Sequence, residues 1–206
     1  MKKIFTLLAA LVVGGAAASA EVKIGETTYD DLAAAVANAT EGATITVNGE
    51  IQIANTVDLS NVPNITISAE EENATIKCLV KNKLAFLTHN TATLKNLTLT
   101  YIENDASSSP LIESSNSTGN LTIDNCTICN FNGTNNQGVI SVKGSGKVKL
   151  NNVTFTNNTV KEGRGEVFIG NSGSTIDGTT NCSLYIENQS IAAGSNFDPA
   201  EQLILY

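Results

Sequence analysis

The chain has 206 residues with 20 acidic and 12 basic side chains, a formal net charge of −8, 4 Tyr, 6 Phe and no Trp. Proteins that bind nucleic acid or anionic membranes need a Lys- and Arg-rich surface that neutralises phosphate, so this charge argues against both classes and we expect no nucleic-acid partner. The 25 Asn and 24 Thr residues favour turns and β-structure over helix.

Residues 1–20 have the composition of a bacterial secretory signal peptide. Lys2 and Lys3 form a basic n-region, Ile4 to Val13 an apolar h-region, and Ala18-Ser19-Ala20 an A-x-A cleavage site. The apolar run is short for a bilayer and no other segment approaches spanning length, so we expect no membrane span after signal removal. Loss of the two lysines deepens the net charge to −10. The sequence therefore predicts an exported acidic protein, secreted, held at the cell surface or periplasmic.

Residues 21–42 are expected to form an N-terminal region built on one short amphipathic helix. Thr28 is placed to begin this helix, with Asp31 three residues later as in a capping box, and Gly42 is placed to end it. The helix is predicted over Asp30–Ala39. Its apolar face holds Tyr29, Leu32, Ala33 and Val36.

From residue 43 onward, short runs of alternating Thr, Val and Ile separated by Asn, Gly, Ser and Asp predict β-strands. A motif with a central Asn repeats through this part, with steps of 32, 29, 27 and 36 residues. The repeated residues are Asn64, Asn96, Asn125, Asn152 and Asn188. A second apolar run recurs every 28 residues, at Leu111-Ile112, Val139-Ile140 and Val167-Phe168. Each repeat therefore contains at least two strands.

The phase of the apolar residues predicts a corner at the repeated Asn. Alternate side chains in a strand point to opposite faces, yet Leu94 is out of phase with Leu97, so the chain must bend at Asn96. Asn tolerates unusual backbone angles, and identical amides stacked coil upon coil can hydrogen-bond along the stack. We therefore predict a structural stack of corner amides in a solenoid whose coils share one core.

Three repeats carry a resemblance to a known family, and they read Leu94-Lys95-Asn96-Leu97-Thr98-Leu99, Ile123-Asp124-Asn125-Cys126-Thr127-Ile128 and Leu150-Asn151-Asn152-Val153-Thr154-Phe155-Thr156. This pattern resembles the coils of the pectin-lyase-like superfamily, over roughly residues 43–191. The resemblance implies an all-β fold, a right-handed, single-stranded parallel β-helix of about five or six coils over residues 43–206. It also implies that the preceding helix is an N-terminal cap, which would cover the unpaired strand edges of the first coil.

The chain has four cysteines, Cys78, Cys126, Cys129 and Cys182, whose disulfide state the sequence leaves open. Cys126 and Cys129 have the C-x-x-C spacing of redox motifs. Their register places Cys126 inward and Cys129 outward, and no helix follows, so we expect a core residue and no redox site. His89 is the sole histidine, and no metal site is expected.

The resemblance raises polysaccharide lyases and glycoside hydrolases as alternatives. Lyases of the family place acidic Ca²⁺ ligands beside an Arg or Lys base, and the inverting hydrolases cluster Asp carboxylates. The acidic residues of this chain are scattered, with Glu162 and Glu166 on either side of the sole arginine, Arg164. We therefore expect no catalytic residues and no cofactor, and only the lyase alternative would involve Ca²⁺.

Binding is expected first at the polar loop over residues 101–109, the longest insertion beside a coil. The candidate binding residues are Tyr101, Glu103, Asp105, Glu113 and Arg164. Phe131 and Tyr185 are further candidates for an aromatic surface that stacks on a sugar. The outward threonines form a predicted array on one face, which we interpret as ordinary exposed strand surface. They are Thr66, Thr98, Thr100, Thr127, Thr154 and Thr156.

Three functional hypotheses follow from these observations. The first is an exported, non-catalytic module that binds a glycan or a protein at the cell surface or outside the cell. The second is a small polysaccharide lyase or glycoside hydrolase. The third is a structural module that self-associates end to end through its C-terminal coil.

Overall fold

The structure, a computed structural model, describes residues 20–70, 74–102, 106–115, 120–143, 147–162, 164–169, 175–176 and 184–186. Several predictions from the sequence lie outside this part of the chain. They concern the signal peptide up to residue 19, Glu103, Asp105, Cys182, Asn188 and the end of the C-terminal coil.

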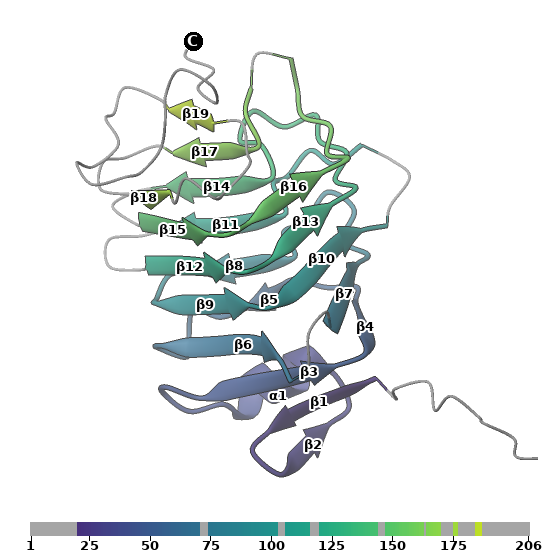
Figure 1. Ribbon diagram of the computed structural model, residues 1–206, viewed down its shortest axis with the longest axis vertical. Coiled ribbons are helices and arrows are strands. Elements are labelled where there is room, and N and C mark those ends of the chain that lie inside the picture. Colours follow the sequence, from purple (N-terminus) through teal and green to yellow (C-terminus); the bar gives the residue numbers. More distant parts are fainter. Residues whose placement is uncertain are drawn as a thin grey trace, which may run out of the picture.

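Three kinds of strand recur in the same order along the chain and stack into three sheets, here named A, B and C (Figure 1). Sheet A contains β3 (Thr44–Asn48), β6 (Ile65–Ala69), β9 (Ala92–Lys95), β12 (Asn120–Asp124), β15 (Lys147–Asn151) and β18 (Thr175–Ile176). Sheet B contains β4 (Glu50–Ile53), β7 (Ala74–Cys78), β10 (Leu97–Tyr101), β13 (Thr127–Cys129) and β16 (Thr154–Thr156). Sheet C contains β5 (Val57–Asp58), β8 (Phe86–Thr88), β11 (Ile112–Ser115), β14 (Ile140–Lys143), β17 (Val167–Ile169) and β19 (Leu184–Ile186).

Neighbouring strands from successive repeats pair in parallel in all three sheets. One A, one B and one C strand make up a coil, and the coils stack along a single axis (Figure 1). The chain is therefore a mostly β protein with a parallel β-solenoid, as the repeat predicted.

The first residues of the described chain form an antiparallel hairpin and the helix α1. Strand β1 (Glu21–Ile24) pairs antiparallel with both β2 (Thr27–Tyr29) and β3, so the hairpin extends sheet A beyond the first coil. Helix α1 (Leu32–Asn38) contacts β1, β2 and β5. Its buried residues are Leu32, Ala35 and Val36. Within the described chain, no helix has the length and apolarity needed to span a bilayer.

The predicted start of the helix is wrong. The N-cap residue is Asp31, whose carboxylate accepts a hydrogen bond of 2.7 Å from the backbone N–H of Ala34. Thr28 lies instead in β2, because residues 27–29 pair with β1. The helix ends at Asn38 with Ala39 as its C-cap, and Gly42 (φ 76°) lies beyond it, with its N–H donating to the carbonyl of Pro63.

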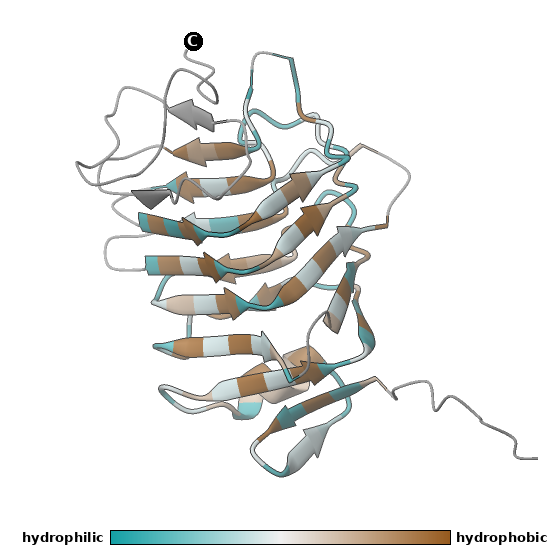
Figure 2. Cartoon of the chain, viewed as in Figure 1, coloured by the Kyte–Doolittle hydropathy of each residue, from teal (hydrophilic) through white to brown (hydrophobic). Residues whose placement is uncertain are grey.

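The core is built from columns of aliphatic side chains at equivalent positions of successive coils. Figure 2 shows the cause, an alternation of hydrophobic and hydrophilic residues along the strands. The clearest column, in sheet A, is fully buried and contains Ile45, Ile67, Leu94, Ile123 and Leu150. Burial of one such side chain stabilises the folded state by about 1.5–3 kcal/mol. The burial depends on contact with the neighbouring coils, because a single coil cannot cover its own apolar side chains.

Candidate functional site

Asn96, Asn125 and Asn152 occupy the corner where the chain passes from sheet A to sheet B. Their φ angles are 56°, 52° and 47°, in the left-handed region. Asn enters this region more readily than other residues with a side chain, because its short amide bonds locally. Each corner turns the strand away from the plane of sheet A, and Figure 1 shows the resulting bend between β9 and β10, and again in the two following coils.

The three side-chain amides form a hydrogen-bonded ladder. Nδ2 of Asn125 donates to Oδ1 of Asn96 at 2.9 Å, and Nδ2 of Asn152 donates to Oδ1 of Asn125 at 2.7 Å. Both bonds run from the later coil to the earlier one. The amide dipoles therefore align head to tail, and the ladder has a direction.

Asn64 does not belong to this ladder, and its predicted register is wrong. Ile65 pairs with Ala92 of sheet A, whereas Leu97 pairs with Ala74 of sheet B. Asn64 (φ 58°) thus lies at the corner that leads into sheet A, where its Nδ2 donates to Glu41 at 3.3 Å. The pattern Asn-apolar-Thr-apolar fits the start of a strand in either sheet, so the sequence alone cannot separate the two corners.

The outer side of the A-to-B corner carries a groove of about 270 Å³, here called the amide groove. Its lining residues are Asn96, Leu97, Thr98, Asn125, Cys126, Thr127, Asn152 and Thr154. Thr98, Thr127 and Thr154 are in register on neighbouring strands. The groove therefore has a column of amides beside a column of hydroxyls, and no charged side chain of the described chain lines it.

The border of the amide groove on sheet A is close to electrically neutral. Lys95 and Asp124 directly precede two of the corner amides in the chain, and their side chains approach to 3.5 Å. The two side chains are 48% and 32% exposed, so the pair contributes less than about 1 kcal/mol to stability. The pair matters for the groove because the positive charge of Lys95 and the negative charge of Asp124 neutralise each other at its border.

The amide groove was not predicted as a binding site, although its residues were singled out. A structural role was predicted for the amides, and an exposed position for the threonines. The spacing Asn-x-Thr places an amide and a hydroxyl two residues apart at each repeat, which is the signal that could have identified the groove. The spacing does not indicate the angle between sheets A and B, and the groove depends on this angle.

The predicted threonine array is divided between two sheets. Thr66 lies on sheet A, in register with Thr44 and Thr93, and so is not part of the sheet B surface. Thr100 is 9% exposed, and its hydroxyl accepts a hydrogen bond of 3.0 Å from Nδ2 of Asn130. The prediction of a single array is therefore wrong. One accessible hydroxyl column lies on the outer face of sheet A, and a second one lines the amide groove.

The three described cysteines are free thiols, and Cys126 and Cys129 have the predicted orientations. Cys126 is 2% exposed, and its Sγ lies 3.3 Å from the carbonyl oxygen of Asp124. Desolvation by burial raises the pKa of Cys126 to about 11 and also raises the pKa of the fully buried Cys78. Cys129 is partly exposed on the outer face of sheet B, in register with Thr100. Reactivity is thus expected at Cys129 and not at the buried pair.

The predicted aromatic surface at the polar loop is wrong. Tyr101 is 2% exposed and Phe131 is 1% exposed. Their rings pack edge to face, with centroids 5.3 Å apart and an interplanar angle of 64°. Tyr101 follows the inward phase of Leu97 and Leu99 in β10 and is in register with buried Cys78. Neither ring presents a face to a ligand, because both belong to the core.

The other candidate binding residues in the described chain occupy separate environments. Glu113 lies on sheet C, where Oε2 forms a 2.6 Å ion pair with Nζ of Lys143. Arg164 lies in the connection between β16 and β17, and its backbone N–H donates to the carbonyl of Lys161. With Tyr101 in the core, the three described candidates do not form the predicted loop site.

Polar residues in the connections from sheet B to sheet C hold successive coils together. The N–H of Ser107 donates to the carbonyl of Asn132 at 2.7 Å, and the N–H of Gly133 to the carbonyl of Thr159 at 2.8 Å. The N–H of Ser108 donates to Oδ1 of Asn82 at 2.9 Å. These contacts explain the Asn- and Ser-rich composition of the connections by structure, without a ligand.

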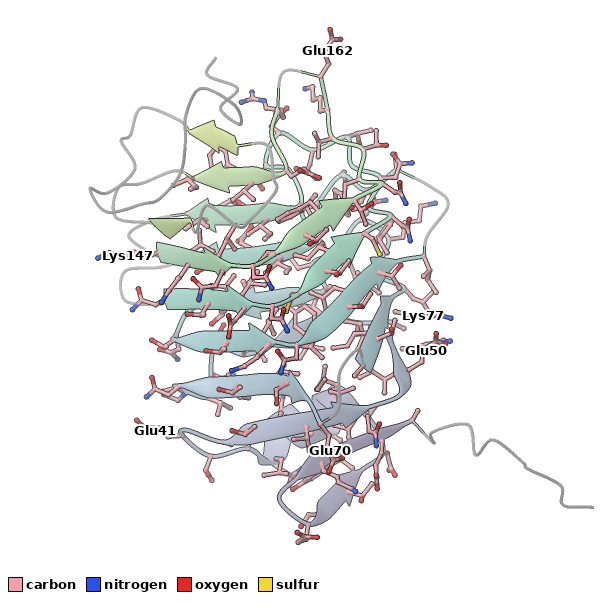
Figure 3. The ribbon with its side chains drawn as sticks, in the orientation of Figure 1. Glu41, Glu50, Glu70, Lys77, Lys147 and Glu162 are labelled. Atoms are coloured by element: carbon pink, nitrogen blue, oxygen red, sulfur yellow. The ribbon has the colours of Figure 1, made fainter. Side chains whose placement is uncertain are left out.

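Several acidic side chains are engaged by lysines instead of facing one another. Besides Glu113 and Asp124, Glu50 pairs with Lys77 at 2.6 Å. Figure 3 shows this pair side by side, and Glu41, Lys147 and Glu162 apart from one another at the edges of the molecule. In the described ranges, no three His, Cys, Asp or Glu residues gather in a group able to hold a metal ion, so the residues there do not fit the Ca²⁺ site of the lyase alternative.

Comparisons with models of protein families, with curated proteins and with solved structures give no match for this chain.

Proposed function

We propose that this chain is an exported, non-catalytic β-solenoid module that binds a glycan, and that the amide groove is its contact site. The observation that supports this function is the lining of the groove by three amides and three hydroxyls in two parallel columns. Amides and hydroxyls both donate and accept hydrogen bonds, as the hydroxyl groups of a sugar require.

A binding role is preferred to catalysis because of the arrangement of acidic groups. Polysaccharide hydrolases need two carboxyl groups on either side of the scissile bond. Glu113, Asp124 and Glu50 each have a lysine partner, and none of them lines the amide groove. The groove itself contains no side chain suited to general acid or base chemistry at neutral pH, since burial keeps the Cys126 thiol protonated.

The remaining parts of the proposal concern architecture and export. The solenoid is right-handed, as parallel crossover connections are in nearly all proteins, and belongs with the pectin-lyase-like coils that its repeats resemble. Helix α1 and the β1–β2 hairpin act as an N-terminal cap, because they lie against the strands of the first coil. Residues 1–20 direct export and are removed.

The test is a glycan-binding screen with the mature chain, residues 21–206, followed by matched substitutions. Thr127→Val removes one hydroxyl from the amide groove while keeping the β-branched shape. Thr122→Val makes the same change in the same coil, but on the outer face of sheet A and outside the groove. One lost hydrogen bond of about 0.5–1.5 kcal/mol weakens binding by roughly 2- to 12-fold in the first variant alone.

Three results would overturn the proposal. Absence of binding to any glycan in a broad panel, with the wild-type chain correctly folded by circular dichroism, refutes the function. Equal loss of affinity in Thr127→Val and Thr122→Val, or no loss in either, refutes the groove as the contact site. Capture of a protein partner that competes with no glycan would assign the chain to the other binding class.

A further inference from the structure

The amide groove has the same functional groups at the same place in three successive coils. Asn96, Asn125 and Asn152 recur along one line, and Thr98, Thr127 and Thr154 along a second. Parallel strands in a sheet are spaced by about 4.8 Å, so each group recurs at about this interval along the solenoid axis. This distance is on the order of the length of one sugar ring in an extended chain. A ligand with a repeating unit can therefore make equivalent contacts at each coil.

The ladder leaves hydrogen-bonding capacity for such a ligand. A side-chain amide has two N–H donors and an oxygen with two acceptor sites. Asn125 uses one donor toward Asn96 and one acceptor site toward Asn152. It retains the capacity for one further donated and one further accepted bond. Because the ladder also fixes the side chain in position, little rotamer entropy remains to be lost on binding.

The lining argues against a charged ligand. No described Lys, Arg, Asp or Glu lines the amide groove. At its border, Lys95 and Asp124 form an ion pair at 3.5 Å and neutralise each other's charge. A uronate or sulfated polymer would lose hydration of its charges without gaining a cation in exchange. The lining also contains no aromatic ring, so contact with a sugar is made through its hydroxyl edge rather than its face.

The ladder also distinguishes the two directions along the groove. Both amide bonds donate from the later coil to the earlier one. The amide donors and acceptors therefore follow the same order along the solenoid axis at Asn96, Asn125 and Asn152. A chain with two different ends meets different partners in its two orientations, and one orientation is favoured.

On these grounds we propose that the amide groove takes a neutral, extended, linear polysaccharide that lies parallel to the solenoid axis, with about one sugar ring per coil and in one direction. This proposal rests on the proposed function, and it specifies the class and placement of the ligand. It departs from the uronate polymers that the family resemblance raises. Three coils line the groove, so a segment of about three rings fills it.

The first experiment measures affinity against ligand length and charge by titration calorimetry with the mature chain. The probes are neutral gluco-, xylo- and manno-configured oligosaccharides of two to six units, and galacturonate oligomers of the same lengths. For one neutral series, affinity rises at least threefold from two to three units and levels off beyond about four. Binding is unchanged between low and high salt, because a neutral ligand has no charge to screen.

The second experiment tests direction with a quencher on the reducing end of the bound oligosaccharide. Lys77, Thr100, Cys129 and Thr156 form one column on sheet B beside the groove. A dye is placed on Lys77→Cys or on Thr156→Cys, in a chain that also carries Cys129→Ser and Cys182→Ser. Unequal quenching at the two ends is expected. Equal quenching, with affinity retained in both labelled chains, rules out a single direction.

The outcomes separate this proposal from the function on which it rests. Tightest binding to the galacturonate series, with affinity that falls in high salt and in Thr127→Val, refutes the neutral ligand and leaves the groove as a glycan site. Affinity independent of length also refutes the extended placement. Failure of every glycan to bind the folded chain refutes both proposals together.

Discussion

Replacing Asn125 by Ala and by Gly separates the two contributions of a corner amide to stability. Asn125 has a φ of 52° and takes part in two side-chain hydrogen bonds, at 2.9 and 2.7 Å. The left-handed region costs alanine about 1–2 kcal/mol, whereas Asn avoids much of this cost because its amide can hydrogen-bond locally. The two bonds are exposed and contribute about 0.5 kcal/mol each, at the low end of the usual range. Asn125→Ala should therefore lower the free energy of unfolding by about 2–3 kcal/mol.

Asn125→Gly removes the same amide without the backbone strain. It loses the two bonds, about 1 kcal/mol, and a few tenths more because glycine is freer in the unfolded chain. Urea unfolding followed by far-ultraviolet circular dichroism measures both variants, with Asn120→Ala, an exposed change in the same coil, as the control. Equal destabilisation by Ala and Gly would contradict the role of the left-handed corner. A loss below about 0.5 kcal/mol in both would contradict the role of the ladder.

Three further predictions address packing, pH and charge. Gly138→Ala should cost more than about 3 kcal/mol, because at a φ of 68° a Cβ would lie 2.3 Å from the carbonyl oxygen of Gly165. Burial raises the pKa of Cys126 from its ordinary value of 9.0 to about 11 in the folded state. Its contribution to the free energy of unfolding is therefore complete below pH 9, and that free energy decreases by about 2–3 kcal/mol as the pH rises to about 11. Removing either partner of the Glu113–Lys143 pair should cost about 1 kcal/mol, with a coupling energy of about 0.5–1 kcal/mol in a double-mutant cycle.

Each of these predictions has a matched comparison. Gly25 has a φ of 56° with open space around its missing Cβ, so Gly25→Ala should cost about 1–2 kcal/mol, and a loss as large as that of Gly138→Ala would contradict the packing argument. Cys126→Val should flatten the decrease in stability above pH 9, and an unchanged slope would assign that decrease to other groups. A coupling of zero in the double-mutant cycle would show that Glu113 and Lys143 act independently.

The solenoid could be predicted because its evidence is periodic. The out-of-phase step between Leu94 and Leu97 required a bend at Asn96, and the left-handed backbone there agrees with it. The same rule of alternation, carried two residues past Leu99, would have placed Tyr101 inward. The loop prediction for this residue was therefore avoidable, since β10 continues to Tyr101 with an unbroken phase.

Other features depend on information that the repeat does not contain. The registers of Asn64 and Thr66 needed the identity of the paired strand, which is a long-range property. The N-cap is Asp31 and not Thr28, because residues 27–29 pair with β1. This strand pairing is a tertiary contact that the local helix motif does not reveal. The amide groove needed the angle between two sheets. In each case the missing quantity is a relation between segments rather than a property of one.

The equivalence of successive corners also determines how this architecture can change in evolution. Asn125 and Asn152 occupy the same position 27 residues apart, each bonded to its neighbour in the same sense. Loss or duplication of that interval joins two chain ends that already match in backbone conformation, inward phase and ladder polarity. Unequal recombination within the gene could therefore shorten or lengthen the amide groove by a whole coil at a time. The length of polymer that the groove contacts would then depend on the number of coils, and each added coil would pack on its neighbours without further sequence change.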